Sequence, residues 1–154
     1  MYCMDLRWRM DKAAHLAYLG TLAQEGFVVA SVEYRTSNEG THPMQLCDIK
    51  AAIRYLRAYA KRYRINREKF GVMGESAGGY LSCMAALDQD KKLDTGEYLE
   101  YSSQVQAACP WYPPTDASHF PYDDVEKAAM SSESLLMGFN VMTHPQEAYE
   151  NSPV

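Results

Sequence analysis

The sequence is poor in the features that mark membrane-spanning, disulfide-rich and nucleic-acid-binding proteins. It has no apolar run of transmembrane length, so we expect no membrane span. Its four cysteines show no C-x-x-C or other metal-ligand spacing, and they imply neither a disulfide framework, a metal site nor another cofactor. Its 15 basic side chains are outnumbered by 20 acidic ones, which argues against a nucleic-acid partner.

Two further absences concern location and domain organisation. No secretory signal peptide is visible, because residues 1–11 carry charges where an apolar stretch would be needed. Without a disulfide framework a reducing compartment is the default, so we expect a cytoplasmic location. The 154 residues are enough for one domain with a core, and no composition shift marks a second domain. We therefore expect a single domain over residues 1–154.

One short motif organises the interpretation of the chain. Residues 74–78, Gly-Glu-Ser-Ala-Gly, fit G-x-S-x-G, with a strand-like run before them and an apolar, helix-like segment after them. In this context the motif places a serine hydroxyl on a sharp strand-to-helix turn. Ser76 is then a candidate nucleophile, beside helical N–H groups that favour an anionic intermediate. The alternative is a glycine-rich helix start with a capping serine.

The periodicity of apolar residues predicts alternating helices and strands. This order indicates an α/β protein with a parallel sheet and flanking helices. The predicted helices are 13–24, 44–63, 77–89, 131–137 and 145–150, and the predicted strands are 27–34, 69–73 and 104–111.

Charged residues on the long helix allow two further predictions. The basic residues between Arg54 and Lys69 have the spacing of a solvated helix face and the turn after it. Asp48, near the start of the same helix, is placed to hold Arg35 at the end of the neighbouring strand.

Three stretches together resemble the α/β-hydrolase esterases, in particular the hormone-sensitive-lipase-like and feruloyl-esterase-like (BD-FAE) branches. They are residues 26–35, 48–57 and 74–79, and residues 111–116 resemble the segment that follows the sixth strand in those enzymes. The resemblance implies a partial α/β-hydrolase fold with Ser76 as nucleophile and the backbone N–H of Ala77 as an oxyanion donor. It also implies an acyl-enzyme on Ser76 that water then hydrolyses.

Several parts of the family pattern have no counterpart in this sequence. Residues 5–7 carry no glycine where a glycine-rich oxyanion loop is expected, and we expect the strand before that loop to be absent. The chain resembles an esterase cut at both ends, before the usual acid and histidine. Asp116 and His144 follow Ser76 in the order that a triad requires, and they are the internal candidates for acid and base. Alternatively, Asp116 makes a turn hydrogen bond.

The function indicated is hydrolysis of small carboxylic esters or of ester-decorated polysaccharides, a substrate class that comes from the resemblance alone. Two alternatives stay open: a serine peptidase of the same fold, and a non-catalytic fragment or binding module that keeps only the nucleophile turn. A sheet without its outer strands would also expose its edges, which favours self-association.

Overall fold

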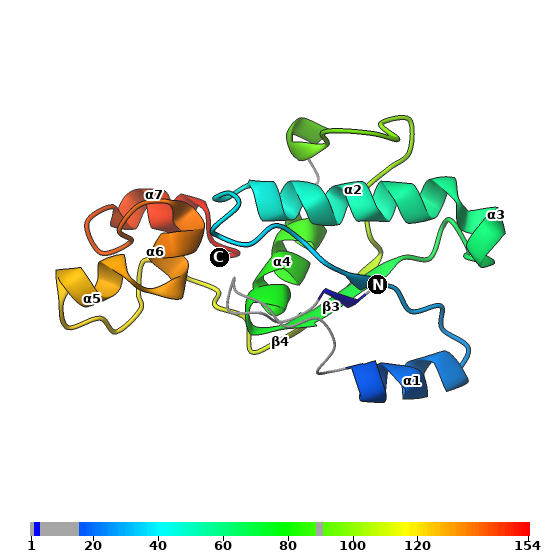
Figure 1. Ribbon diagram of the computed structural model, residues 1–154, viewed down its shortest axis with the longest axis horizontal. Coiled ribbons are helices and arrows are strands. Elements are labelled where there is room, and N and C mark those ends of the chain that lie inside the picture. Colours follow the sequence, from blue (N-terminus) through cyan, green and yellow to red (C-terminus); the bar gives the residue numbers. More distant parts are fainter. Residues whose placement is uncertain (1, 4–15, 89–90) are drawn as a thin grey trace.

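The computed structural model describes residues 2–3, 16–88 and 91–154 (Figure 1). Its core is a four-stranded sheet in the order β2-β1-β3-β4. The strands run parallel, as the alternation of helices and strands predicts. The strands are β1 (Tyr2–Cys3), β2 (Ser31–Val32), β3 (Gly71–Glu75) and β4 (Ala107–Trp111). The helices are α1 (Leu16–Gln24), α2 (Met44–Ala58), α3 (Ala60–Tyr63), α4 (Ser76–Leu87), α5 (Val125–Ala129), α6 (Ser132–Met137) and α7 (Pro145–Glu150).

Helices cover both faces of the sheet. Alternate residues of a strand point to opposite faces, and β3 shows this directly. Val72 is buried in the main core with Ile49 of α2 and Leu81 of α4, whereas Met73 packs with Leu19 of α1 on the other face. Figure 1 shows the same layers, with α2 and α4 on one side of the strands and α1 on the other.

The strand that we expected to be absent is present. Tyr2 and Cys3 form β1, which pairs in parallel with both β2 and β3. Among the described strands β2 pairs only with β1, which has two residues. This explains why the predicted strand 27–34 is observed only over Ser31–Val32. Residues 5–7, where the glycine-rich loop was sought, lie outside the described residues.

The other predicted elements appear with shifted ends. The long helix 44–63 is interrupted at Tyr59, which separates α2 from α3. The helix α5 was missed, because the five-residue segment is too short to show a period; Asp124 caps it by accepting a hydrogen bond from the backbone N–H of Glu126. The two short helices predicted near the end of the chain are confirmed as α6 and α7.

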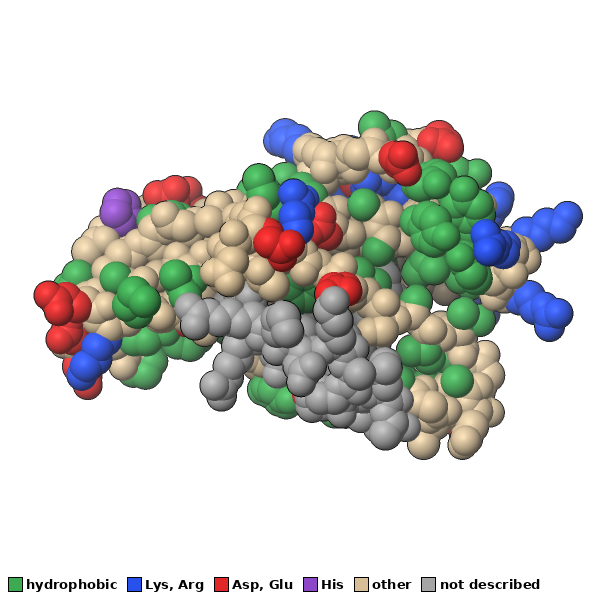
Figure 2. Space-filling model, viewed as in Figure 1, with side chains coloured by type: hydrophobic (Ala, Val, Ile, Leu, Met, Phe, Trp, Pro, Cys, Tyr) green, Lys and Arg blue, Asp and Glu red, His purple; other side chains and the backbone are tan. Residues whose placement is uncertain are grey.

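The prediction of a solvated basic face is confirmed for the segment 61–69 and is wrong for the arginines of α2. Lys61, Arg62 and the later cations up to Lys69 are exposed, and Figure 2 shows Lys and Arg side chains at the end of the molecule that α3 occupies. Arg54 and Arg57 are instead buried. Their guanidinium groups donate to backbone carbonyls of the segment 95–104, which lies over α2, so these cations hold a loop rather than face water.

The described sheet has β2 and β4 at its edges, and most of β4 is exposed. Self-association through this edge stays a prediction. None of the helices in the described ranges is long and apolar enough to span a bilayer. Within the same ranges, no group of three or more His, Cys, Asp and Glu side chains is arranged to hold a metal ion.

Candidate active site

Ser76 lies on a sharp turn between β3 and α4. β3 ends at Glu75 with an extended backbone (φ −111°, ψ 149°), and Ser76 follows with φ +48°. A positive φ is costly for any residue with a Cβ, and such strain persists only where the surrounding structure imposes it. Ala77 is the second residue of α4, so its backbone N–H has no intrahelical acceptor. The geometry is that of a nucleophile elbow.

Close packing between α4 and the end of β4 determines where this turn lies. A Cβ built on Gly79 would come 2.8 Å from the carbonyl oxygen of Trp111 and 3.2 Å from Cβ of Pro113. Only glycine allows the first turn of α4 to approach the neighbouring strand so closely. The carboxyl ends of β3 and β4 therefore meet beside Ser76.

A second strained residue lies at this edge of the sheet. Tyr112 directly follows β4 and has φ +38°. Its hydroxyl donates a 2.5 Å hydrogen bond to Oε2 of Glu75, whose side chain is buried directly before the candidate nucleophile. This contact ties the segment after β4 to the elbow.

The structure does not bring Asp116 and His144 together. Asp116 accepts hydrogen bonds from the N–H and hydroxyl of Ser118, which lower the pKa of its carboxyl, and its Oδ2 lies 2.7 Å from Nδ1 of His119. This is the turn hydrogen bond offered as the alternative for Asp116. Nδ1 of His144 lies 2.9 Å from Oγ1 of Thr143 and 3.3 Å from the carbonyl oxygen of Asn140. Within the described ranges, no hydrogen bond links either histidine to Ser76.

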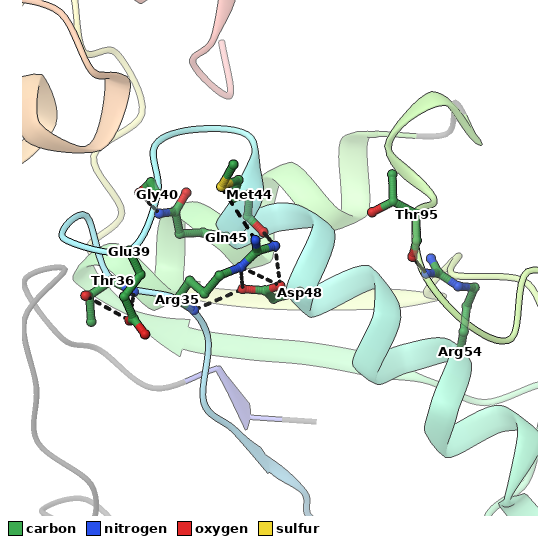
Figure 3. Close-up of polar contacts among 9 residues, drawn as sticks. All are labelled: Arg35, Thr36, Glu39, Gly40, Met44, Gln45, Asp48, Arg54 and Thr95. Carbon is green, nitrogen blue, oxygen red and sulfur yellow. Dashed lines mark hydrogen bonds and ion pairs between the residues drawn. The ribbon is translucent and has the colours of Figure 1, made fainter.

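An ion pair that the sequence predicted, between Arg35 and Asp48, holds the loop after β2. Arg35 and Asp48 form a bidentate ion pair, with Nη2 to Oδ1 at 2.8 Å and Nε to Oδ2 at 3.0 Å, and the backbone N–H of Arg35 also donates to Asp48 (Figure 3). Farther along, Nε2 of Gln45 donates to the carbonyl of Gly40 at 2.7 Å. These contacts fix the loop 35–43 against the start of α2.

A cavity of about 500 Å³ lies between α2, α4 and the segment 150–154. Its lining includes His42, Asp88 and Glu150 but not Ser76, so it is separate from the elbow. The hydroxyl of Tyr80 donates to the carbonyl of Asn151 at 2.7 Å and lies 3.3 Å from Nδ1 of His42. Because the only hydroxyl proton of Tyr80 is used on Asn151, Nδ1 of His42 is assigned as the donor in that contact. Sequence reasoning missed this site, since His42 stands in a loop with no periodic pattern.

Burial lowers the pKa of His42, which makes the stability of this region sensitive to pH. In the unfolded chain the imidazole titrates near its ordinary pKa of about 6.5. The contribution of neutral His42 is therefore complete above that pH and is lost as the pH falls toward the lower folded-state pKa. We expect the unfolding free energy of the wild type to fall more steeply between pH 7 and pH 5 than that of His42→Gln, as measured by urea denaturation. Parallel pH curves for the two proteins would contradict this.

Comparison with known proteins identifies the relatives of this chain. Residues 8–154 match the model of the BD-FAE family. The chain is 35% identical over 92 residues to the probable carboxylic ester hydrolase LipM of Mycobacterium tuberculosis, covering 59% of this chain and 21% of that protein. Among solved structures, it superposes with a TM-score of 0.89 on a bifunctional GH43-CE of Bacteroides eggerthii (28% identity, 99% of this chain, 22% of that one). A truncated carbohydrate esterase from gut microbiota superposes with a TM-score of 0.86 (29% identity, 99% of this chain, 59% of that one).

These likenesses confirm the α/β-hydrolase fold. The chain spans 21% of LipM and 59% of the second solved structure, so it corresponds to part of each of these proteins.

Proposed function

The chain belongs to the BD-FAE family, and from that premise we propose that it forms the nucleophile-bearing part of a serine carboxylesterase, with Ser76 as the attacking residue. The observation that carries this proposal is the φ of +48° at Ser76, at the junction of β3 and α4. A capping serine needs no such strain, because N-cap residues ordinarily have an extended backbone. The strain instead presents the hydroxyl at the carboxyl edge of the sheet, where α/β enzymes bind their substrates.

In the proposed reaction, the Ser76 oxygen attacks the carbonyl carbon of an ester. The bond to the alcohol breaks, the serine proton leaves with the alcohol, and the acyl group stays on Ser76. Water then attacks the acyl-enzyme, which releases the acid and restores the hydroxyl. The N–H of Ala77, at the positive end of α4, donates to the oxyanion in both steps. The proposal assigns no base among the described residues, because no described contact joins Ser76 to a histidine.

The proposed substrate class is ester-decorated polysaccharide. Support comes from the two solved structures above, one described as a carbohydrate esterase and the other as a GH43-CE protein. The surroundings of the elbow are compatible with a sugar, because the rings of Trp111 and Tyr112 are exposed next to it. Aromatic rings with a polar edge suit the mixed apolar and hydroxylated surface of a pyranose.

The proposal predicts covalent labelling of one serine. A fluorophosphonate probe should react slowly, because residues 16–88 and 91–154 place no histidine in contact with Ser76, and the label should map to the peptide that contains Ser76 by mass spectrometry. Ser76→Ala should abolish the label. Ser132→Ala is the matched control, since Ser132 is also a half-buried first residue of a helix, and this variant should label as the wild type does. A folded wild type without label, or a label that survives in Ser76→Ala, would refute Ser76 as the nucleophile.

A further inference from the structure

Four tyrosines gather at the end of the molecule formed by α3 and the C-terminal part of α2. The ring of Tyr55 lies 4.8 Å from that of Tyr59 and 5.8 Å from that of Tyr98, measured between centroids. Hydrogen bonds between hydroxyls join Tyr55 to Tyr63 at 2.9 Å and Tyr59 to Tyr98 at 3.2 Å. Figure 2 shows hydrophobic-type side chains facing solvent at this end, next to Lys and Arg side chains. We call this group the tyrosine cluster.

The cluster is held in place by parts of the fold that do not face solvent. Tyr98 has φ +58°, an unfavourable backbone for a bulky residue. Its loop is nevertheless fixed, because buried Arg54 donates to the carbonyl of Glu97 at 3.2 Å and to that of Thr95. The hydrogen bond with Tyr59 raises the pKa of Tyr98 to about 12, so the Tyr98 hydroxyl stays neutral at physiological pH. The surface is thus a preorganised set of rings and hydrogen-bonded hydroxyls.

Cations lie next to the cluster, although the whole chain is acidic. The segment 61–69 carries five Lys or Arg residues and one Glu. The guanidinium of Arg62 lies 5.6 Å from the ring centroid of Tyr63, and that of Arg67 lies 5.6 Å from the ring of Tyr101. Guanidinium groups bind carboxylates in a bidentate manner. This end of the molecule therefore combines aromatic faces with donors for a carboxylate.

The charge balance favours a sparsely charged ligand over a nucleic acid. Three acidic residues offset part of the positive charge: Glu68 in the segment 61–69, and Glu97 and Glu100 in the loop 95–104. A phosphate backbone carries a charge on every residue and is normally met by a strongly basic face. A polysaccharide with occasional uronic acid residues needs only one or two exposed guanidinium groups, while its sugar rings pack on the aromatic side chains.

We propose that the tyrosine cluster, with Arg62 and Arg67, is a binding site for an acidic polysaccharide that bears uronate groups. Sugar rings contact the Tyr55 side of the cluster, and a uronate carboxylate pairs with the arginines. The site is separate from the elbow: α3 precedes β3 and Ser76 follows it, so the two lie at opposite ends of a strand about 16 Å long (Figure 1). The choice of ligand rests on the proposed function, and the site would hold the polymer while its ester groups reach Ser76.

Binding of ester-free sugars to the full chain tests this proposal by isothermal titration calorimetry. The probes are xylo-oligosaccharides with and without a glucuronate substituent and a single-stranded RNA of similar length. We expect the glucuronate-bearing probe to bind about tenfold more tightly than the neutral one. This preference should vanish at about 1 M salt, because exposed ion pairs are screened there. Equal binding of the two sugars, tighter binding of RNA, or no binding of either sugar would overturn the proposal.

Variants separate the contributions of ring and charge. Tyr55→Ala should weaken the binding of both sugars about tenfold. The double variant Arg62→Gln/Arg67→Gln should remove only the preference for the acidic sugar. Tyr149→Ala, at an exposed tyrosine of α7, should change nothing. The arginine variants leave the rings in place, so they decide the matter even if Tyr55→Ala fails to fold. Unchanged acidic preference in them would contradict the proposal.

The result can be told apart from that of the esterase proposal. Ser76→Ala should bind the sugars as the wild type does. Fluorophosphonate labelling without sugar binding would overturn this inference alone, and sugar binding without labelling would overturn the esterase proposal alone.

Discussion

Replacing Arg54 by alanine is expected to destabilise the fold by about 3–5 kcal/mol, because it removes a buried cation that pairs with the Asp94 carboxylate and leaves two carbonyl groups without their donor. Arg54 has no exposed surface. Its Nη1 lies 2.9 Å from Oδ1 of Asp94, and its other nitrogens donate to the carbonyls of Thr95 and Glu97. Lys50 lies 3.3 Å from the same carboxylate oxygen but is also shared with Asp88 at 2.7 Å. Lys50 alone therefore cannot replace the contacts of Arg54.

Urea denaturation, followed by circular dichroism, measures this change. A loss of this size corresponds to a drop in Tm of roughly 10 °C for a chain of this length. Arg54→Lys should fall between the wild type and Arg54→Ala, since one ammonium cannot reach three acceptors in the same geometry. Lys61→Ala is the matched control: Lys61 is an exposed cation of α3, and its removal should change stability by less than about 0.5 kcal/mol. Equal effects of Arg54→Ala and Lys61→Ala would show that the buried cation does not hold the loop.

Replacing Gly79 by alanine is the second change with a large expected effect. The new Cβ would lie 2.8 Å from the backbone carbonyl of Trp111, and a backbone atom cannot rotate away as a side chain can. Either α4 or the end of β4 must move, at a cost of about 1–3 kcal/mol. Because Ser76 opens α4, the same movement displaces the candidate nucleophile. We expect Gly79→Ala to lose both stability and fluorophosphonate labelling.

Gly71→Ala is the matched control for this substitution. Gly71 stands at the other end of β3, where a Cβ would lie 3.6 Å from the carbonyl of Ala107, an ordinary van der Waals distance. Alanine there is expected to be neutral or to stabilise by about 0.5 kcal/mol, because it restricts the unfolded chain. If the two alanine variants unfold at the same urea concentration and label at the same rate, close packing at Gly79 does not position the elbow.

Some parts of the site could be predicted from the sequence and others could not. The elbow was predictable, because its turn, its glycines and its flanking strand and helix are all local along the chain. The Arg35–Asp48 pair was predictable for a similar reason, since both residues lie at element ends that a parallel sheet brings to one edge. The sequence alone could not test the triad hypothesis, because the order of Ser76, Asp116 and His144 along the chain does not give the distances between their side chains. In the structure Asp116 turns back to His119, three residues away, while Nδ1 of His144 lies beside Thr143 and the carbonyl of Asn140, just before α7.

The sequence by itself determined the class of fold, the strand–turn–helix at Ser76 and the family, because these depend on local periodicity and on a short motif. Only the tertiary structure decided which cations of α2 are buried, that Tyr2 and Cys3 complete the sheet, and that four tyrosines gather at one end. The physical reason is the same in each case. The surroundings of a side chain are determined by the distant segment that packs against it. The helical spacing of the residues in α2 is the same whether the loop 95–104 or water covers the helix, so the sequence does not reveal which cations are buried.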